Sequence, residues 1–251
     1  MTGNVSQAYA VAPAPDAARG VHEVVLELLD QEKPGCLLDA PAGEGAFAGL
    51  VRERGYEVSC ADINPRRFRL RGLTCREADM NQPWPFDSER FDYVVSIEAV
   101  EHLENPWHMM REANRVLRIG GKLLVTTPNV LSIRSRLSYL LYGYPNYFHY
   151  MIEQEPDRRK ELPVDHINPV GFLELRHVLA RCGFVVEDIR TNRFVKPRSL
   201  AYGFVKRLLH MRGKTHARND SAKAQVRQWL LSDPLLFGEI LIIKAVKAGS
   251  L

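Results

Sequence analysis

The feature that most limits what this chain can fold into is an apolar run that ends in an acid and opens into a glycine turn. The run is Cys36-Leu37-Leu38-Asp39, followed by Ala40-Pro41-Ala42-Gly43-Glu44-Gly45. Pro34-Gly35 breaks whatever precedes it, and a short apolar run is typical of a buried parallel strand. The two glycines of the turn lack the Cβ atoms that would keep backbone away from a ligand. Because apolar residues then recur at helical spacing over 46–51, the sequence predicts strand, ligand-binding turn and helix.

Two further predicted strands lead into acids in the same way. Tyr56 to Asp62 forms a second strand, whose closing carboxylate suits two ribose hydroxyls, and Asp79 follows a third, where it could accept an adenine amino group. Phe91 to Ile97 and Gly120 to Pro128 read as a fourth and a fifth strand. The carboxyl ends of parallel strands meet at one edge of a sheet, so these acids should lie together.

In order and spacing these motifs resemble the class I S-adenosylmethionine-dependent methyltransferases, from roughly Val21 to Lys247 apart from two insertions. The resemblance implies a Rossmann-like α/β fold with a mixed seven-stranded sheet, one antiparallel strand and helices on both faces. It also implies an S-adenosylmethionine site. The residues expected there are Asp39, Ala40, Gly43 and Gly45 for the methionine part, Asp62 for the ribose, Asp79 and Met80 for the adenine, and also Ile63 and Ser96.

The glycine turn is open to two other interpretations. Gly43-x-Gly45-x-x-Ala48 also fits the loose dinucleotide pattern, with Asp62 at nearly the distance of its ribose-binding acid, so a nicotinamide-dependent oxidoreductase is a rival. Asp39 and the Asp79-Met80 pair disfavour it. Pro41 stands where the family usually has glycine, and its missing N–H would leave only a carbonyl to approach a ligand. A binding module that kept the fold and lost catalysis is therefore a second alternative.

Amphipathic helices are predicted around Val21 to Leu29, over the first strand, and around Trp107 to Leu117 and Phe172 to Leu179. Gly183 should close the last of these, before a sixth strand at Phe184 to Val186 and a final one at Glu239 to Lys244.

Composition supports one domain in a reducing compartment. With 251 residues and 45% apolar content, a single α/β domain over 17–251 is expected, preceded by a loose Ala/Pro-rich tail over 1–16. The four cysteines show no C-x-x-C spacing, and neither a signal peptide nor a membrane span is evident. We expect a cytoplasmic protein; the sequence does not indicate its oligomeric state.

The first insertion, about 129–163, holds five of the nine tyrosines, at 139, 142, 144, 147 and 150. These rings could form a lid that stacks on a sugar or aromatic acceptor, or they could simply pin the insertion to the domain.

The second insertion, about 194–234, is strongly basic. Nine Lys or Arg between Lys196 and Arg227 face the single acid Asp220, a net charge of +8, which leaves −4 for the rest of a chain of net charge +4. With the apolar positions between Leu200 and Met211, this pattern suits peripheral contact with the inner, anionic face of a membrane, or a groove for phosphate-bearing substrate. Alternatively, the basic segment is a solvent-exposed surface that binds no partner. No nucleic-acid-binding module is recognised.

The chemistry is expected after the fourth strand, at Glu98-Ala99-Val100-Glu101-His102. If this stretch is one helical turn, Glu98, Glu101 and His102 share a face, and His166 in Asp165-His166-Ile167-Asn168-Pro169 could join them. The combination resembles metal-dependent small-RNA 2′-O-methyltransferases, which implies Mg²⁺, Mn²⁺ or Zn²⁺ held by Glu98, Glu101, His102 and His166. Ubiquinone-pathway O-methyltransferases share a similar Glu-x-x-Glu-His. Without a metal, His166 oriented by Asp165 is the expected general base, with His102 lining the pocket.

The sequence therefore predicts O-methylation of a hydroxyl on a saccharide, a glycolipid precursor or a similar anionic small molecule. The long insertion after Pro128 also resembles methyltransferases of surface-polysaccharide synthesis. Methylation of a quinone or another isoprenoid at the membrane surface is the alternative acceptor class.

Overall fold

The computed structural model describes residues 12–148, 166–195, 207 and 221–249. Its strands form one seven-stranded sheet in the order β3-β2-β1-β4-β5-β7-β6. Only β7 runs antiparallel to its neighbours, β5 and β6. This is the predicted Rossmann-like mixed sheet. The strands are β1 (Cys36–Asp39), β2 (Glu57–Asp62), β3 (Cys75–Glu77), β4 (Phe91–Ser96), β5 (Leu117–Pro128), β6 (Phe184–Thr191) and β7 (Ile240–Lys247).

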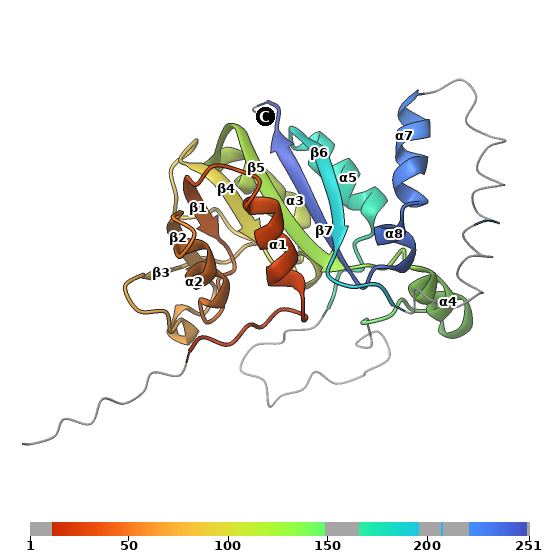
Figure 1. Ribbon diagram of the computed structural model, residues 1–251, viewed down its shortest axis with the longest axis horizontal. Coiled ribbons are helices and arrows are strands. Elements are labelled where there is room, and N and C mark those ends of the chain that lie inside the picture. The colour runs from red at the N-terminus through yellow and green to blue at the C-terminus, as the bar shows by residue number, and fades with distance from the viewer. Residues whose placement is uncertain (1–11, 149–165, 196–206, 208–220, 250–251) are drawn as a thin grey trace, which may run out of the picture.

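Helices cover both faces of the sheet (Figure 1). The helices are α1 (Val21–Leu29), α2 (Ala46–Arg52), α3 (Pro106–Val116), α4 (Ile133–Tyr142), α5 (Phe172–Arg181), α7 (Ser221–Leu230) and α8 (Asp233–Phe237), with 3-10 turns η1 (Pro65–Arg67) and η2 (Val100–His102). Successive strand residues point to opposite faces, so Leu37 packs with α1 and α2, whereas Leu38 packs with α3 and α5. Both strand faces are apolar for this reason.

Three elements differ from the sequence prediction. β5 begins at Leu117 instead of Gly120, because the strand continues through a register shift opposite β4. β6 extends to Thr191, since β7 pairs with it along its length. α1 contacts β6 and β7 most closely, although Leu37 of β1 belongs to its apolar cluster.

The topology brings four strand ends to one edge of the sheet. β1, β2, β3 and β4 are parallel, so the residues that follow them converge at their carboxyl ends. Among the described residues, none of the helices has the length and apolar character that a membrane span requires.

Candidate active site

A cavity of about 830 Å³ opens at this carboxyl edge. Most of the residues that the sequence predicts for a cofactor or for catalysis line it. They are Asp39, Gly43, Asp62, Ile63, Asp79, Met80, Glu98, His102 and His166. Segments far apart in the sequence thus contribute to a single site. Asp165 lies outside the described residues.

Asp62, at the end of β2, is held by two backbone amides. Gly43 N donates to one carboxylate oxygen at 2.9 Å and Asn64 N donates to the other at 2.8 Å. Gly43 has φ +53, a conformation that glycine adopts without strain. The turn after β1 therefore fixes the acid that ends β2, and this carboxylate has the orientation and charge to accept hydroxyl donors.

Asp39, at the end of β1, has a different environment. The residue is 1% exposed and its Oδ2 has no hydrogen-bond partner among the described residues. Burial, reinforced by the charge of Asp62, raises the pKa of Asp39 to about 8. The backbone of Ala48 also bonds to this carboxyl and opposes the rise in pKa. A buried carboxyl that lines a cavity with one oxygen unpartnered is suited to a cationic ligand group.

Three predicted cofactor contacts lie outside the cavity lining. Ala40 N continues the strand pairing by donating to Val95 O at 3.0 Å, and its side chain is buried. Ser96 is 0% exposed at the end of β4. Gly45, with φ +92, serves packing, because a Cβ there would lie 2.7 Å from the Phe68 ring.

The chain before α1 also contributes to the site, which the sequence did not indicate. Ala14, Asp16, Ala17 and Ala18 line the cavity. Ala14 N donates to Glu44 at 3.0 Å, and Asp16 forms an ion pair with Arg67 at 2.8 Å. Ala14 and Asp16, which composition assigns to the tail, thus contact the domain.

Glu98 does not join the predicted ligand set. It has φ +47 and precedes η2, so Glu98, Glu101 and His102 are not one helical turn. Its carboxylate accepts from Ala18 N at 2.6 Å, and its amide donates to Thr126. The prediction of a shared helical face was therefore wrong at Glu98, whose side chain holds the chain before α1.

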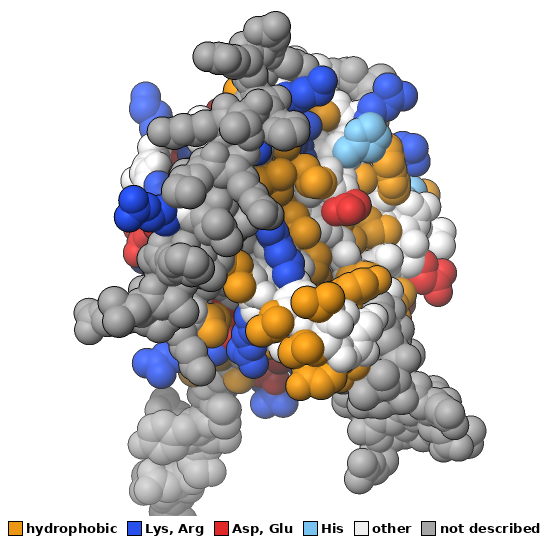
Figure 2. Space-filling model, turned by 90° about the vertical axis from the view of Figure 1, so that its right-hand side faces the viewer, with side chains coloured by type: hydrophobic (Ala, Val, Ile, Leu, Met, Phe, Trp, Pro, Cys, Tyr) orange, Lys and Arg blue, Asp and Glu red, His pale blue; other side chains and the backbone are white. Residues whose placement is uncertain are grey.

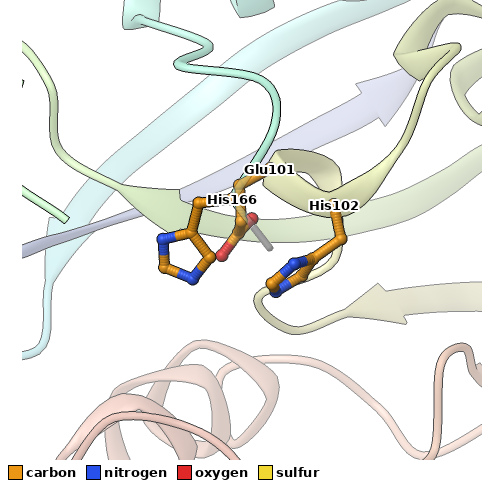
Figure 3. Close-up of side chains that lie close together, drawn as sticks. All are labelled: Glu101, His102 and His166. Carbon is orange, nitrogen blue, oxygen red and sulfur yellow. The ribbon is translucent and has the colours of Figure 1, made fainter. Parts of the chain in front are cut away.

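Glu101, His102 and His166 do come together (Figure 3). One ligand atom from each lies within 4.8 Å of the others. The two imidazole centroids are 4.8 Å apart. Glu101 is 0% exposed, and neither carboxylate oxygen makes a hydrogen bond of good geometry with the described residues. Burial raises its pKa to about 8, against the opposing effect of its own amide and the nearby Thr127 hydroxyl. Three of the four predicted ligands therefore form a cluster.

Asn168 joins the two halves of this cluster. Its amide N–H donates to Glu101 O at 2.9 Å, and its side-chain Nδ2 donates to Leu103 O. The segment that carries His166 is thereby fixed to the turn that carries Glu101 and His102. In the sequence, Asn168 stands out only as part of the motif from Asp165 to Pro169.

Among the described residues of the aromatic insertion, Tyr147 is the one that reaches the cavity. It lines the cavity with φ +75, and its hydroxyl donates to Glu239 at 2.5 Å. Arg193 makes two hydrogen bonds to Glu239 and holds the pKa of that acid down to about 2. The next residue, Phe148, is buried with its ring 5.4 Å from His166. By contrast, Tyr139 and Tyr142 are exposed, and Tyr150 lies outside the described residues.

Comparison with known proteins decides the family. A model described as a methyltransferase domain matches residues 14–189. A protein of Mycolicibacterium smegmatis designated a probable S-adenosylmethionine-dependent methyltransferase is 30% identical over 173 residues, which are 66% of this chain and 59% of that protein. The chain belongs to the S-adenosylmethionine-dependent methyltransferase family.

Further similar proteins include a curated relative and a solved structure. A demethylmenaquinone methyltransferase of Tropheryma whipplei is 27% identical over 158 residues, 59% of this chain and 65% of that protein. A solved methyltransferase structure from Archaeoglobus fulgidus has a TM-score of 0.56 at 20% identity, covering 90% of this chain and 94% of that one, a likeness of fold. The matched part spans less than two thirds of both curated relatives.

The groups that line the cavity suit S-adenosylmethionine, the cofactor that the family implies. The unpartnered oxygen of Asp39 suits the ammonium of the methionine part, and Asp62 suits ribose hydroxyls. Ile63 and Met80 offer apolar contact to an adenine ring beside Asp79. Apolar walls with a few fixed polar groups are typical of small-molecule sites.

Proposed function

We propose that this methyltransferase methylates a hydroxyl oxygen of a saccharide, a glycolipid precursor or a similar anionic small molecule, with S-adenosylmethionine as methyl donor. One observation carries the proposal. His102 and His166 line the same cavity as Asp39 and Asp62, with Glu101 buried behind them. Proton-accepting groups thus lie in the cavity that fits the methyl donor.

The chemistry requires a base because a hydroxyl is a weak nucleophile. The acceptor oxygen forms a bond to the methyl carbon as the carbon–sulfur bond breaks, and the hydroxyl proton must leave. We assign that proton to the imidazole of His166, with His102 beside it. A negative charge on Glu101 would stabilise this imidazolium, and the imidazolium would in turn lower the pKa of Glu101. The assignment of Asp165 as the group that orients His166 stays a prediction.

A divalent cation is a second route to the same reaction. One carboxylate and two imidazoles fit a first-row transition metal better than Mg²⁺, which prefers oxygen ligands. The absence of Glu98 from the cluster thus shifts the expectation toward Mn²⁺ or Zn²⁺. When bound, such an ion would lower the pKa of the acceptor hydroxyl, and Glu101, His102 and His166 would hold it.

The test combines cofactor titration with turnover. Formation of S-adenosylhomocysteine would be followed with lipid-linked sugars and, separately, with prenylated phenols, which represent the quinone alternative suggested by the demethylmenaquinone methyltransferase relative. Each assay would be run in chelator and with added Mg²⁺, Mn²⁺ or Zn²⁺. The variants are His166→Gln and Glu101→Gln. His177→Gln is the matched control, because His177 is exposed on α5 outside the cavity lining.

We expect His166→Gln to lower kcat by roughly 10²- to 10⁴-fold with unchanged cofactor affinity, and the control to match wild type. Turnover that is abolished by chelator and restored by one ion would select the metal route. Higher turnover with prenylated phenols would select the quinone class of acceptor. Cofactor binding without turnover on either panel would contradict the proposal and favour a non-catalytic module.

A further inference from the structure

The outer side of α4 is an exposed apolar stripe. Leu137, Leu140 and Leu141 are 52%, 80% and 62% exposed. Their spacing of i, i+3 and i+4 places them on one face of the helix. Hydrophobic side chains gather over α4 in the lower part of the face seen in Figure 2. Monomeric proteins rarely expose contiguous leucines in this way unless the patch has a partner.

Arginines flank the stripe on both sides. Arg134 and Arg136 are exposed, and at 100° per residue they fall on opposite flanks of the leucine stripe. α4 contains no acidic residue. The Arg136 guanidinium also donates to Leu131 O at 2.7 Å. The Tyr139 and Tyr142 rings, 62% and 68% exposed, lie on the same helix but on the side away from the leucines. Leucines flanked by cations are typical of helices that lie in the headgroup region of anionic bilayers.

The opposite side of α4 is anchored by polar contacts. Ser132 caps the helix by accepting from Ser135 N at 3.1 Å. The Ser135 hydroxyl accepts from Asn146 N at 3.0 Å, and the Ser138 hydroxyl donates to Tyr144 O at 3.0 Å. α4 also contacts α8. The helix is therefore fixed to the domain by its serine side, and its leucines point away.

From these observations we infer that α4 docks the methyltransferase on an anionic lipid bilayer. The positive charge of the flanking arginines favours an anionic bilayer on this face over a second copy of the chain. If two α4 helices packed together, the arginines of the two copies would lie near one another and repel. Docking depends on surface chemistry alone and not on the acceptor.

The position of α4 connects docking to the cavity. α4 lies between Pro128, at the end of β5, and Tyr147, and both of these residues line the cavity. A bilayer on the leucine face therefore lies beside the wall of the cavity that the insertion forms. Resting on the proposed function, this arrangement favours an acceptor with a lipid tail, whose polar end enters the cavity from the membrane surface.

The experiment is flotation of purified full-length protein with vesicles, without acceptor. One set of vesicles is phosphatidylcholine and the other contains about a third phosphatidylglycerol, an anionic lipid. The test variant is Leu140→Gln/Leu141→Gln, which keeps good helix formers in exposed positions. The control is Ile119→Thr/Val185→Thr, because these residues are 57% and 55% exposed near the starts of β5 and β6, at the opposite edge of the sheet.

We expect wild type and control to float with the anionic vesicles and the leucine variant to lose affinity by roughly tenfold or more. Arg134→Gln should weaken binding and reduce its salt dependence, whereas Arg71→Gln near β3 should not. Equal binding of the leucine variant and wild type would overturn the inference. So would vesicle-independent dimers that the leucine variant abolishes. S-adenosylmethionine titration of the same samples reports folding, so failure to dock is distinguishable from failure of methyl transfer.

Discussion

At the scale of single residues, two acids of one site have opposite environments. Asp62 accepts two backbone hydrogen bonds, whereas Asp39, one strand away, has an oxygen without a partner among the described residues. The difference follows from the turn after β1, whose Gly43 amide points at Asp62. Asp39 is thus left for a ligand, and the folded protein without cofactor bears the cost of its burial.

This cost predicts a pH dependence of stability. The pKa of Asp39 rises from 3.8 to about 8 on folding. Between these values the folded protein holds a proton that the unfolded chain has released, so the free energy of unfolding falls as pH rises. One such proton contributes a slope of up to about 1.4 kcal/mol per pH unit.

We expect Asp39→Asn to reduce that slope between pH 5 and pH 7 by about 1 kcal/mol per pH unit, measured by urea unfolding. The same variant should bind S-adenosylmethionine at least about tenfold more weakly, because the cofactor's ammonium would then face a neutral amide in place of a carboxylate. Wild type and variant with parallel pH profiles would show that Asp39 is ionised in the folded protein.

At the scale of elements, Asn168 joins the segment that precedes α5 to η2 and to the residue that follows it. Asn168→Ala removes the hydrogen bond to Leu103 O that holds the His166 segment against η2. We expect kcat to fall roughly 10- to 100-fold, because misplacement of a catalytic group slows the reaction. Cofactor affinity should stay near wild type.

Asn105→Ala is the matched control. Asn105 caps α3 by accepting from His108 N at 3.1 Å, and its loss should cost about 1 kcal/mol of stability. If Asn168→Ala and Asn105→Ala lower the free energy of unfolding alike but only the former lowers kcat, Asn168 positions the histidines. Equal kcat values would leave Asn168 with a purely structural role.

The elements also show what the sequence can predict. Strands that end in acids and helices with apolar spacing could be predicted from the sequence, because both patterns depend on residues close together in the chain. The turn at Glu98 was misjudged because its φ of +47 is set by contacts to Ala18 and Thr126, which are distant in sequence. The bond from Tyr147 to Glu239 spans 92 positions and has no local signal. The basic segment between Lys196 and Arg227, predicted to contact an anionic membrane face or a phosphate-bearing substrate, lies mostly outside the described residues.

At the scale of the whole molecule, the site depends on both ends of the described chain. Ala14 and Asp16 lie at one side of the cavity, and Glu239 and Ile240 also line it. β7, the last strand in sequence, lies between β5 and β6. The cavity is therefore complete only when the whole sheet has formed, and a ligand in it should stabilise the fold as one unit.

Ligand binding should therefore stabilise the whole domain. S-adenosylhomocysteine at about 100 times its Kd should add roughly 2.7 kcal/mol of stability and raise Tm by roughly 5–10 °C. Asp16→Ala should reduce the shift, because Asp16 and Arg67 form an ion pair and both line the cavity. Hydrogen exchange locates the effect: amides of 14–18 should gain local protection that those of α5 do not, since the first segment lines the cavity and α5 does not. Ligand binding that leaves the exchange of 14–18 unchanged would show that this segment does not close over the cofactor.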